Sequence, residues 1–236
     1  MPAIDASTLL RPGLLEHVSI LLARASSAGA EASLGGSVAA ACTGLGAYVC
    51  ECRLAVDVVP EGQDDETERA ARDAVEEALA DAGAIQLLVV DAASVFSRAR
   101  DEARHGDRDD AARHALRACL DASWNVTRAV AERVFLPESR GGRIVYLAPP
   151  LDAGEHADAA CAGLENLART LSIEWARHQI TAVAIAPGAG AGSGQRGGAD
   201  AAATTHEAAA LTAYLASPAG AYFSGCLLDL RGPSRS

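Results

Sequence analysis

The fold is decided by residues 143–185, which read RIVYLAPPLDAGEHADAACAGLENLARTLSIEWARHQITAVAI. This stretch opens with an apolar run at 143–147 and closes with another at 180–185, both of strand length. Between them, the apolar residues of 157–177 recur every three to four positions, which is the period of an amphipathic helix. A strand, a helix and a second strand in this order predict a βαβ unit, in which a helix joins two parallel strands.

The same alternation extends over the rest of the 236 residues. Continuous apolar runs predict strands, because the strands of a parallel sheet are buried on both faces. Residues 1–16 are expected to form an N-terminal extension, and the low-complexity stretch 188–203 a flexible Gly/Ala-rich loop. We therefore predict one α/β domain over 1–236, with strands at 18–23, 47–54, 85–90, 143–147, 180–185 and 226–230 and helices at 33–45, 66–82, 109–134, 157–177 and 205–216.

Composition excludes several classes of function. The chain has 31 acidic and 20 basic residues, a formal net charge of -11, which argues against nucleic-acid binding because that needs clustered cations. All the basic residues are arginine, so any mechanism that needs a lysine is excluded. No apolar run approaches the ~20 residues of a membrane span, and the first residues do not resemble a signal peptide. We expect no membrane partner.

The six cysteines are scattered along the chain. They form no CxxC pair and no spacing typical of metal ligands. Reduced cysteines of this kind are typical of cytoplasmic proteins, because disulfides persist mainly in oxidising compartments. We therefore predict a cytoplasmic protein with no metal site, in which Cys42, Cys50, Cys52, Cys119, Cys161 and Cys226 stay reduced.

A series of short motifs runs in order through the second half of the chain. They are GGRIV at 141–145, AGLENLARTL at 162–171, EWARH at 174–178, IAPG at 185–188, EAAAL at 207–211, YLASP at 214–218 and the run 225–232. Together they resemble the short-chain dehydrogenase/reductase family. The resemblance implies a Rossmann-type, doubly wound α/β fold in three layers and, in most members, NAD(P)-dependent oxidoreduction. From the strand spacing and the uninterrupted apolar runs, we predict that its parallel sheet has seven strands.

The cofactor loop of that family is degenerate in this chain. The family pattern is T-G-x-x-x-G-x-G after the first strand, where glycines let the backbone approach the cofactor diphosphate. The resemblance places this pattern at residues 23–30, where Arg24, Ala28 and Ala30 replace the three glycines. We interpret this run as an ordinary strand-to-helix turn rather than a working phosphate loop.

A second register of the same pattern starts later in the chain. It uses Gly29 and Gly35, and it places Ser33 at the middle glycine and Glu31 inside the loop. A carboxylate beside a diphosphate is repulsive. Either register therefore predicts that the chain binds no NAD(P) cofactor.

The catalytic positions of the family are empty of suitable groups. The resemblance implies a serine that orients the carbonyl, a tyrosine that donates the proton and a lysine four residues later that lowers the tyrosine pKa and holds the ribose. Counting back from 162–164 places the tyrosine at Ala157 and the lysine at Cys161, and the serine pair falls on Ala148 and Pro149. Family-type proton transfer needs a group within reach of the substrate oxygen, so we predict that Pro149, Ala157 and Cys161 are vestigial.

Two other family motifs are altered, and a few reactive side chains remain nearby. The N-N-A-G motif appears at residues 90–93 without its amide side chains, and the asparagine of the long helix falls near Cys119. His156 and Asp158 are weak catalytic candidates, because a Cys/His pair with Cys161 would resemble a nucleophilic site. The alternative is that Asp158 caps the helix start and that Cys161 fills the core.

The chain keeps what the fold needs and lacks what the chemistry needs. The resemblance implies a non-catalytic pseudoenzyme subunit, paired with an active paralogue in a heterodimer or α2β2 heterotetramer. Such complexes act on β-hydroxyacyl or β-oxoacyl thioesters, so acyl-thioester or polyketide-type substrates are expected. One alternative is a cofactor-free lyase, isomerase or cyclase with His156 or Asp158 as base, and another is a homodimer that binds a small ligand.

The partner is expected on the two long helices of the second half. One side of the helix at 157–177 is an apolar stripe and another side carries small residues, so that a second helix can approach closely. Tryptophan is enriched at interface anchors, and each of the two helices carries one; packing in the core is the alternative for both. We predict a four-helix contact with another chain of this fold, disrupted by Gly163→Arg, with Trp124, Gly163, Leu167, Leu171 and Trp175 in the interface.

Overall fold

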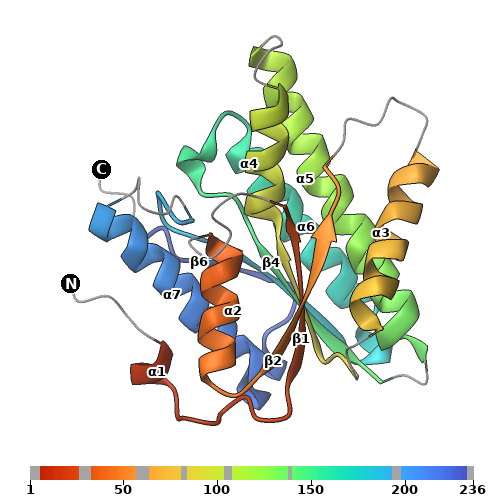
Figure 1. Cartoon of the computed structure of the whole chain (residues 1–236), viewed down its shortest axis with the longest axis vertical. Coiled ribbons are helices and arrows are strands. Elements are labelled where there is room, and N and C mark those ends of the chain that lie inside the picture. Colours follow the sequence, from red (N-terminus) through yellow and green to blue (C-terminus); the bar gives the residue numbers. More distant parts are fainter. Residues whose placement is uncertain are drawn as a thin grey trace.

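The sheet follows the apolar runs of the sequence. The computed structural model describes residues 6–26, 33–56, 64–80, 84–103, 108–137, 140–192 and 198–232. Within them, parallel strands form one sheet in the order β2-β1-β3-β4-β5-β6 (Figure 1). Each strand lies within two residues of its predicted bounds: β1 (Ser19–Ala25), β2 (Tyr48–Leu54), β3 (Leu87–Asp91), β4 (Gly142–Leu147), β5 (Ile180–Ala186) and β6 (Cys226–Asp229).

Five of the helices occupy the stretches predicted to be helical. They are α2 (Leu34–Gly44), α3 (Asp64–Leu79), α5 (Arg108–Val130), α6 (Ala157–Glu174) and α7 (Gly198–Ala216). A π-helical turn over Ala131–Phe135 continues α5, and a 3-10 turn over Ala176–His178 follows α6. Two further short turns, Leu151–Ala153 and Pro218–Tyr222, precede α6 and β6 respectively.

Two helices and one helix start were not predicted. Helix α1 (Ala6–Leu9) lies in the predicted extension, and α4 (Ala92–Glu102) follows β3 where the sequence was interpreted as a turn. The prediction of a loop over 188–203 is wrong at its end, because α7 begins at Gly198. Alanine has the highest helix propensity, so the Ala-rich end of that stretch forms the first turns of α7.

Helices cover both faces of the sheet. On one face, α3, α4, α5 and α6 share a core cluster with alternate strand residues such as Leu21 and Ala23. On the other face, α1, α2 and α7 pack against the intervening residues, such as Ile20 and Leu22. Figure 1 shows α2 and α7 on one side of the sheet and α3 to α6 on the other. The three-layer, doubly wound arrangement predicted from the sequence is confirmed.

The predicted count of seven strands is wrong for the described residues, which contain six. The prediction rested on the strand spacing and the uninterrupted apolar runs, but the runs assigned to strands number six. After β2, the chain leads to α3 on the face opposite α2 and then to β3 on the far side of β1. Consequently β2 is an edge strand of this sheet, and β6 is the other.

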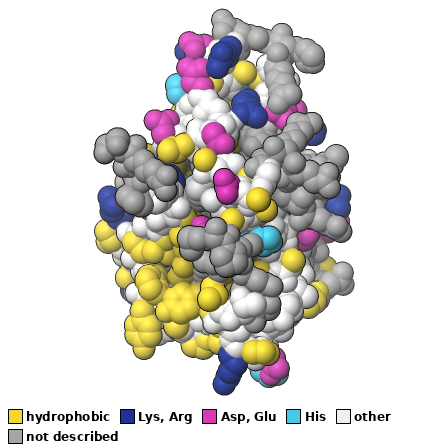
Figure 2. Space-filling view, turned by 90° about the vertical axis from the view of Figure 1, so that its left-hand side faces the viewer, with side chains coloured by type: hydrophobic (Ala, Val, Ile, Leu, Met, Phe, Trp, Pro, Cys, Tyr) yellow, Lys and Arg dark blue, Asp and Glu magenta, His cyan; other side chains and the backbone are white. Residues whose placement is uncertain are grey.

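Apolar side chains are exposed on the side of the molecule that carries α1 and α7. Figure 2 shows hydrophobic side chains gathered on the lower part of this face. Leu9 of α1 is 62% exposed, and Tyr222, just after α7, is 91% exposed. This apolar face lies across the sheet from α5 and α6, so it gives a second surface against which the predicted interface can be tested.

Candidate functional site

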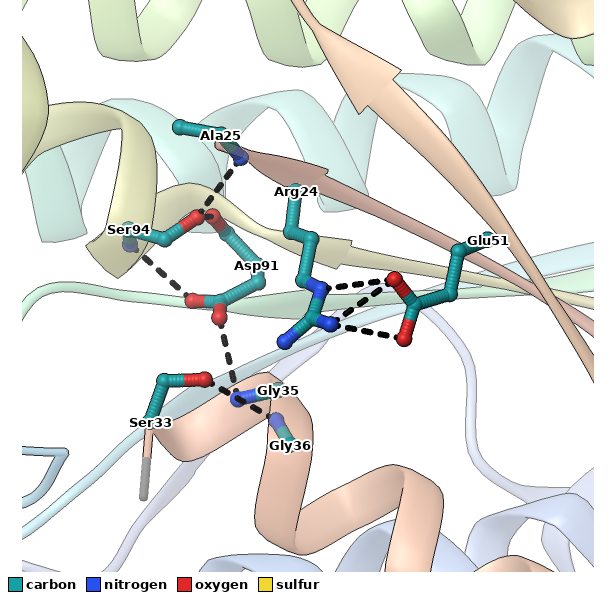
Figure 3. Close-up of polar contacts among 8 residues, drawn as sticks. All are labelled: Arg24, Ala25, Ser33, Gly35, Gly36, Glu51, Asp91 and Ser94. Carbon is teal, nitrogen blue, oxygen red and sulfur yellow. Dashed lines mark hydrogen bonds and ion pairs between the residues drawn. The ribbon is translucent and has the colours of Figure 1, made fainter. Parts of the chain in front are cut away.

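The candidate site lies where the direction of winding reverses. The chain proceeds from β1 to β2 on one side of the sheet and from β3 to β6 on the other. Open α/β sheets bind their ligands outside the carboxyl ends of the strands at such a reversal, which here are the ends of β1 and β3. Figure 3 shows that Arg24, Asp91, Ser94 and the start of α2 converge here.

Helix α2 begins in the second register considered for the cofactor loop. Ser33 is the N-cap, and its hydroxyl oxygen accepts a hydrogen bond from the Gly36 N–H at 3.0 Å. Leu34 and Gly35 lie in the first turn of α2, and Gly35 is the last glycine of the loop pattern in that register. The remaining loop positions, Ala28, Gly29, Ala30 and Glu31, lie outside the described residues.

Arg24, which the first register places at the first family glycine, is part of β1. Its guanidinium binds the Glu51 carboxylate of β2, with Nη2 at 2.7 Å from Oε1 and Nε at 3.1 Å from Oε2. The Arg24 side chain is only 13% exposed. A large cation therefore fills the space beside the strand end where the family pattern has no side chain.

Asp91 is fully buried and connects two helices. Its Oδ1 accepts a hydrogen bond from the Ser94 N–H of α4 at 3.0 Å, and its Oδ2 accepts one from the Gly35 N–H of α2 at 2.9 Å. Burial raises the pKa of Asp91, and the two backbone hydrogen bonds and the positive charge of Arg24 oppose that rise. The Ser94 hydroxyl accepts from the Ala25 N–H and donates to the Asp91 carbonyl, so β1, β3 and α4 are also joined.

The three positions predicted to be vestigial lie just after β4 and in the first turns of α6. Pro149 is buried just after β4, Ala157 is the first residue of α6, and Cys161 follows one turn later. Ala157 and Cys161 are 0% and 3% exposed. Burial raises the pKa of the Cys161 thiol, and the positive charge of Arg231 opposes this. None of these three side chains is a proton donor of the kind that the family mechanism uses.

The two leftover candidates differ in their surroundings. His156 is half-buried at the N-cap of α6 and has a left-handed backbone, with φ at 64°. Asp158 is exposed, and its carboxylate accepts a hydrogen bond from the Ala159 N–H at 2.8 Å. The Asp158 contact fits the capping alternative, because it satisfies a backbone donor in the first turn of α6.

Cys119 of α5 lies next to the candidate site, at the start of α4. Its thiol donates to the Ala92 carbonyl at 3.5 Å, and it is completely buried. Burial raises the pKa of this thiol, and the negative charge of Asp91 adds to the rise. Cys119 therefore acts here as a packed core residue beneath the start of α4.

The predicted interface residues are only partly at the surface. Leu171 is 1% exposed, and Gly163 faces Leu120 of α5, since a Cβ on Gly163 would lie 2.8 Å from Leu120 Cδ2. Both therefore pack within the chain. Leu167 and Trp175 are half-buried, and Trp124 is 38% exposed. Gly163→Arg would disturb the packing of α6 on α5 and is not a clean test of association.

The described residues contain neither a cluster that could hold a metal ion nor a helix that could span a membrane. Among them, no group of three or more His, Cys, Asp and Glu side chains is placed to hold a metal ion. No helix in the described ranges is both long enough and apolar enough to span a bilayer. All six cysteines are free thiols in the structure.

The sheet order and the site at its point of reversal define a Rossmann-like α/β protein. The family model for short chain dehydrogenases matches residues 53–195, more than half of the chain. The chain therefore belongs to the short-chain dehydrogenase family. A comparison with curated proteins finds no match.

Solved structures with the same fold include several dehydrogenases. A citronellol catabolism dehydrogenase of Pseudomonas aeruginosa PAO1 is 22% identical, with a TM-score of 0.63 over 94% of this chain and 96% of that chain. A hydroxysteroid dehydrogenase from Escherichia coli is 17% identical, with a TM-score of 0.64 over 94% and 99%. A short chain dehydrogenase from Mycobacterium smegmatis is 21% identical, with a TM-score of 0.62 over 100% and 98%. At these identities the likeness establishes the fold.

Sequence reasoning missed the role of Asp91. It noted only that residues 90–93 lack the amide side chains of the family motif. A signal was present, since Asp91 stands directly after the apolar run 87–90 and three residues before Ser94. An aspartate in that place is a typical N-cap, and the residues after it recur with helical period.

Proposed function

We propose that the chain is a non-catalytic subunit of a heteromeric dehydrogenase or ketoreductase, in which an active paralogue carries out the reaction. The proposal rests on the sequence assignment of Pro149, Ala157 and Cys161 to the positions of the family's serine, tyrosine and lysine. Proline and alanine have no exchangeable side-chain proton, and burial raises the pKa of the Cys161 thiol. Hydride transfer by the family mechanism would lack its proton donor.

The charges at the start of α2 also argue against a nicotinamide cofactor. A diphosphate at this helix would approach the Asp91 carboxylate and compete with it for the Gly35 N–H. Calorimetric titration with the four nicotinamide nucleotides is expected to give no heat of binding. A micromolar Kd, about -8 kcal/mol, would contradict the proposal.

The surface proposed for the partner is the outer face of α5 and α6. Leu116, Leu120 and Trp124 are spaced four residues apart on α5, so they share one face of that helix. Trp124 is 38% exposed. On α6, Ile173 is 72% exposed and lies about three turns beyond Gly163, the residue that faces Leu120. A partner of the same fold would bury this apolar surface in a four-helix contact.

The test is co-expression with an active short-chain dehydrogenase encoded beside this chain. We expect the two to co-purify, and the partner's reduction of a β-oxoacyl thioester to depend on the complex. Trp124→Glu and Ile173→Glu should each weaken the complex at least tenfold without unfolding the chain, because both side chains are exposed. Leu9→Glu is the matched control on the opposite face of the sheet. Failure to co-purify, or disruption by Leu9→Glu alone, would contradict this assignment.

A second candidate is a cofactor-free lyase, isomerase or cyclase. One observation favours it: the left-handed backbone of His156, since strained non-glycine residues cluster at functional sites. The test is turnover of a β-hydroxyacyl thioester by the purified chain without nucleotide. Turnover that His156→Asn abolishes would favour this candidate over the subunit role, because asparagine tolerates the same backbone conformation.

A further inference from the structure

One buried carboxylate completes the N-termini of two helices. Asp91 is 0% exposed, and each of its oxygens accepts one backbone hydrogen bond, from Gly35 in the first turn of α2 and from Ser94 in the first turn of α4. The first N–H groups of a helix have no partner within the helix. They also lie at the positive end of the helix dipole, which favours an anion. Asp91 supplies that anion to both helices.

A cation stands beside the same carboxylate. The charge of Arg24 acts favourably on the ionised form of Asp91. In Figure 3 its side chain lies between Asp91 and Glu51. Two backbone N–H donors from helix starts together with a guanidinium form the kind of site that binds phosphate or carboxylate groups. We call the N–H groups of Gly35 and Ser94, with the Arg24 guanidinium, the anion cradle.

The fit between α2 and Asp91 is close. A Cβ on Gly35 would lie 2.5 Å from Asp91 Oδ2, closer than any side chain tolerates. Glycine at this position therefore lets the backbone of α2 approach the carboxylate. In dinucleotide-binding folds, the same property of glycine lets the backbone approach a ligand's diphosphate.

We propose that Asp91 is an internal substitute for a bound anion: the chain fills the anion cradle of its Rossmann-like crevice with its own carboxylate. The N-termini of α2 and α4 then have their negative partner without a bound ligand. Removing the carboxylate should leave a buried site for a small oxyanion of the carboxylate class. The inference concerns this chain alone, so it holds or fails independently of the proposed partner.

The experiment is rescue of an Asp91→Ala variant by formate. The melting temperature of the full chain is measured in sodium formate and in sodium chloride of equal ionic strength. The variant should melt about 5–10 °C below the wild type, since it loses two charge-assisted hydrogen bonds. Formate should raise its melting temperature at least about 2 °C more than chloride does, by mass action. The wild type should show no difference between the two salts.

Two further variants make the result decisive. Asp152→Ala is the matched control, because the Asp152 carboxylate also accepts a backbone hydrogen bond, from Gly190 at 3.0 Å, but is exposed. It should show no formate-specific gain. If Asp91→Ala does not fold, Asp91→Asn fills the same space and should melt below the wild type with no response to formate. A folded Asp91→Ala without formate rescue, rescue of the wild type, or an Asp91→Asn as stable as wild type would overturn the inference.

Discussion

Replacing Gly35 by alanine tests how closely α2 approaches Asp91. Alanine is a better helix former than glycine, so the change would ordinarily stabilise a helix by up to about 1 kcal/mol. Here the added Cβ would lie 2.5 Å from Asp91 Oδ2 and 3.2 Å from Asp91 Cβ. Because Asp91 is fully buried and held by Ser94 as well, the carboxylate has little room to move away.

The expected cost follows from what the methyl group displaces. The hydrogen bond from the Gly35 N–H to Asp91 is charge-assisted, and losing it costs about 1.5–3 kcal/mol. Overpacking adds about 1–3 kcal/mol, and the helix propensity of alanine offsets up to about 1 kcal/mol. We therefore expect Gly35→Ala to lower the free energy of unfolding by about 2–4 kcal/mol.

Gly44, at the other end of α2, is the matched control. A Cβ on Gly44 would meet no atom within 4 Å, so Gly44→Ala should be neutral or slightly stabilising. The free energy of unfolding is measured by urea titration with circular dichroism for both variants. In an Asp91→Ala background, Gly35→Ala should cost less than about 0.5 kcal/mol, because the atom that it strikes is gone. Equal stability of Gly35→Ala and Gly44→Ala, or additivity with Asp91→Ala, would refute the reasoning.

Two other predictions concern stability and reactivity. Arg143→Met removes a half-buried guanidinium that donates hydrogen bonds to carbonyls at the end of α7. It should lower the free energy of unfolding by about 2–3 kcal/mol. The control is Arg133→Met at an exposed position, which should change the free energy of unfolding by less than about 0.5 kcal/mol. Burial raises the pKa of Cys42 to about 12, whereas Cys226 is partly exposed. A maleimide at about pH 8 should therefore label Cys226 in the native protein and Cys42 only after denaturation. Mass spectrometry measures both labels.

Local patterns in the sequence determined the strands and most of the helices. The strands coincide with six apolar runs, because burial on both faces leaves a continuous apolar signal in adjacent residues. The predicted loss of the family's catalytic groups also rests on the sequence, because it depends on assigning positions 149, 157 and 161 to the family's serine, tyrosine and lysine. The same local patterns did not reveal α4, because its start was interpreted through the family's turn motif.

Tertiary structure alone decided what surrounds each of these residues. The path from β2 to α3 on the opposite face leaves six strands in the described sheet, and the packing of α6 on α5 turns Gly163 toward Leu120. Asp91 and Gly35 are 56 residues apart in the sequence, yet they form one hydrogen bond at the crevice. Such contacts depend on how the sheet brings distant strand ends together, and no periodicity of neighbouring residues encodes which donor a buried carboxylate will meet.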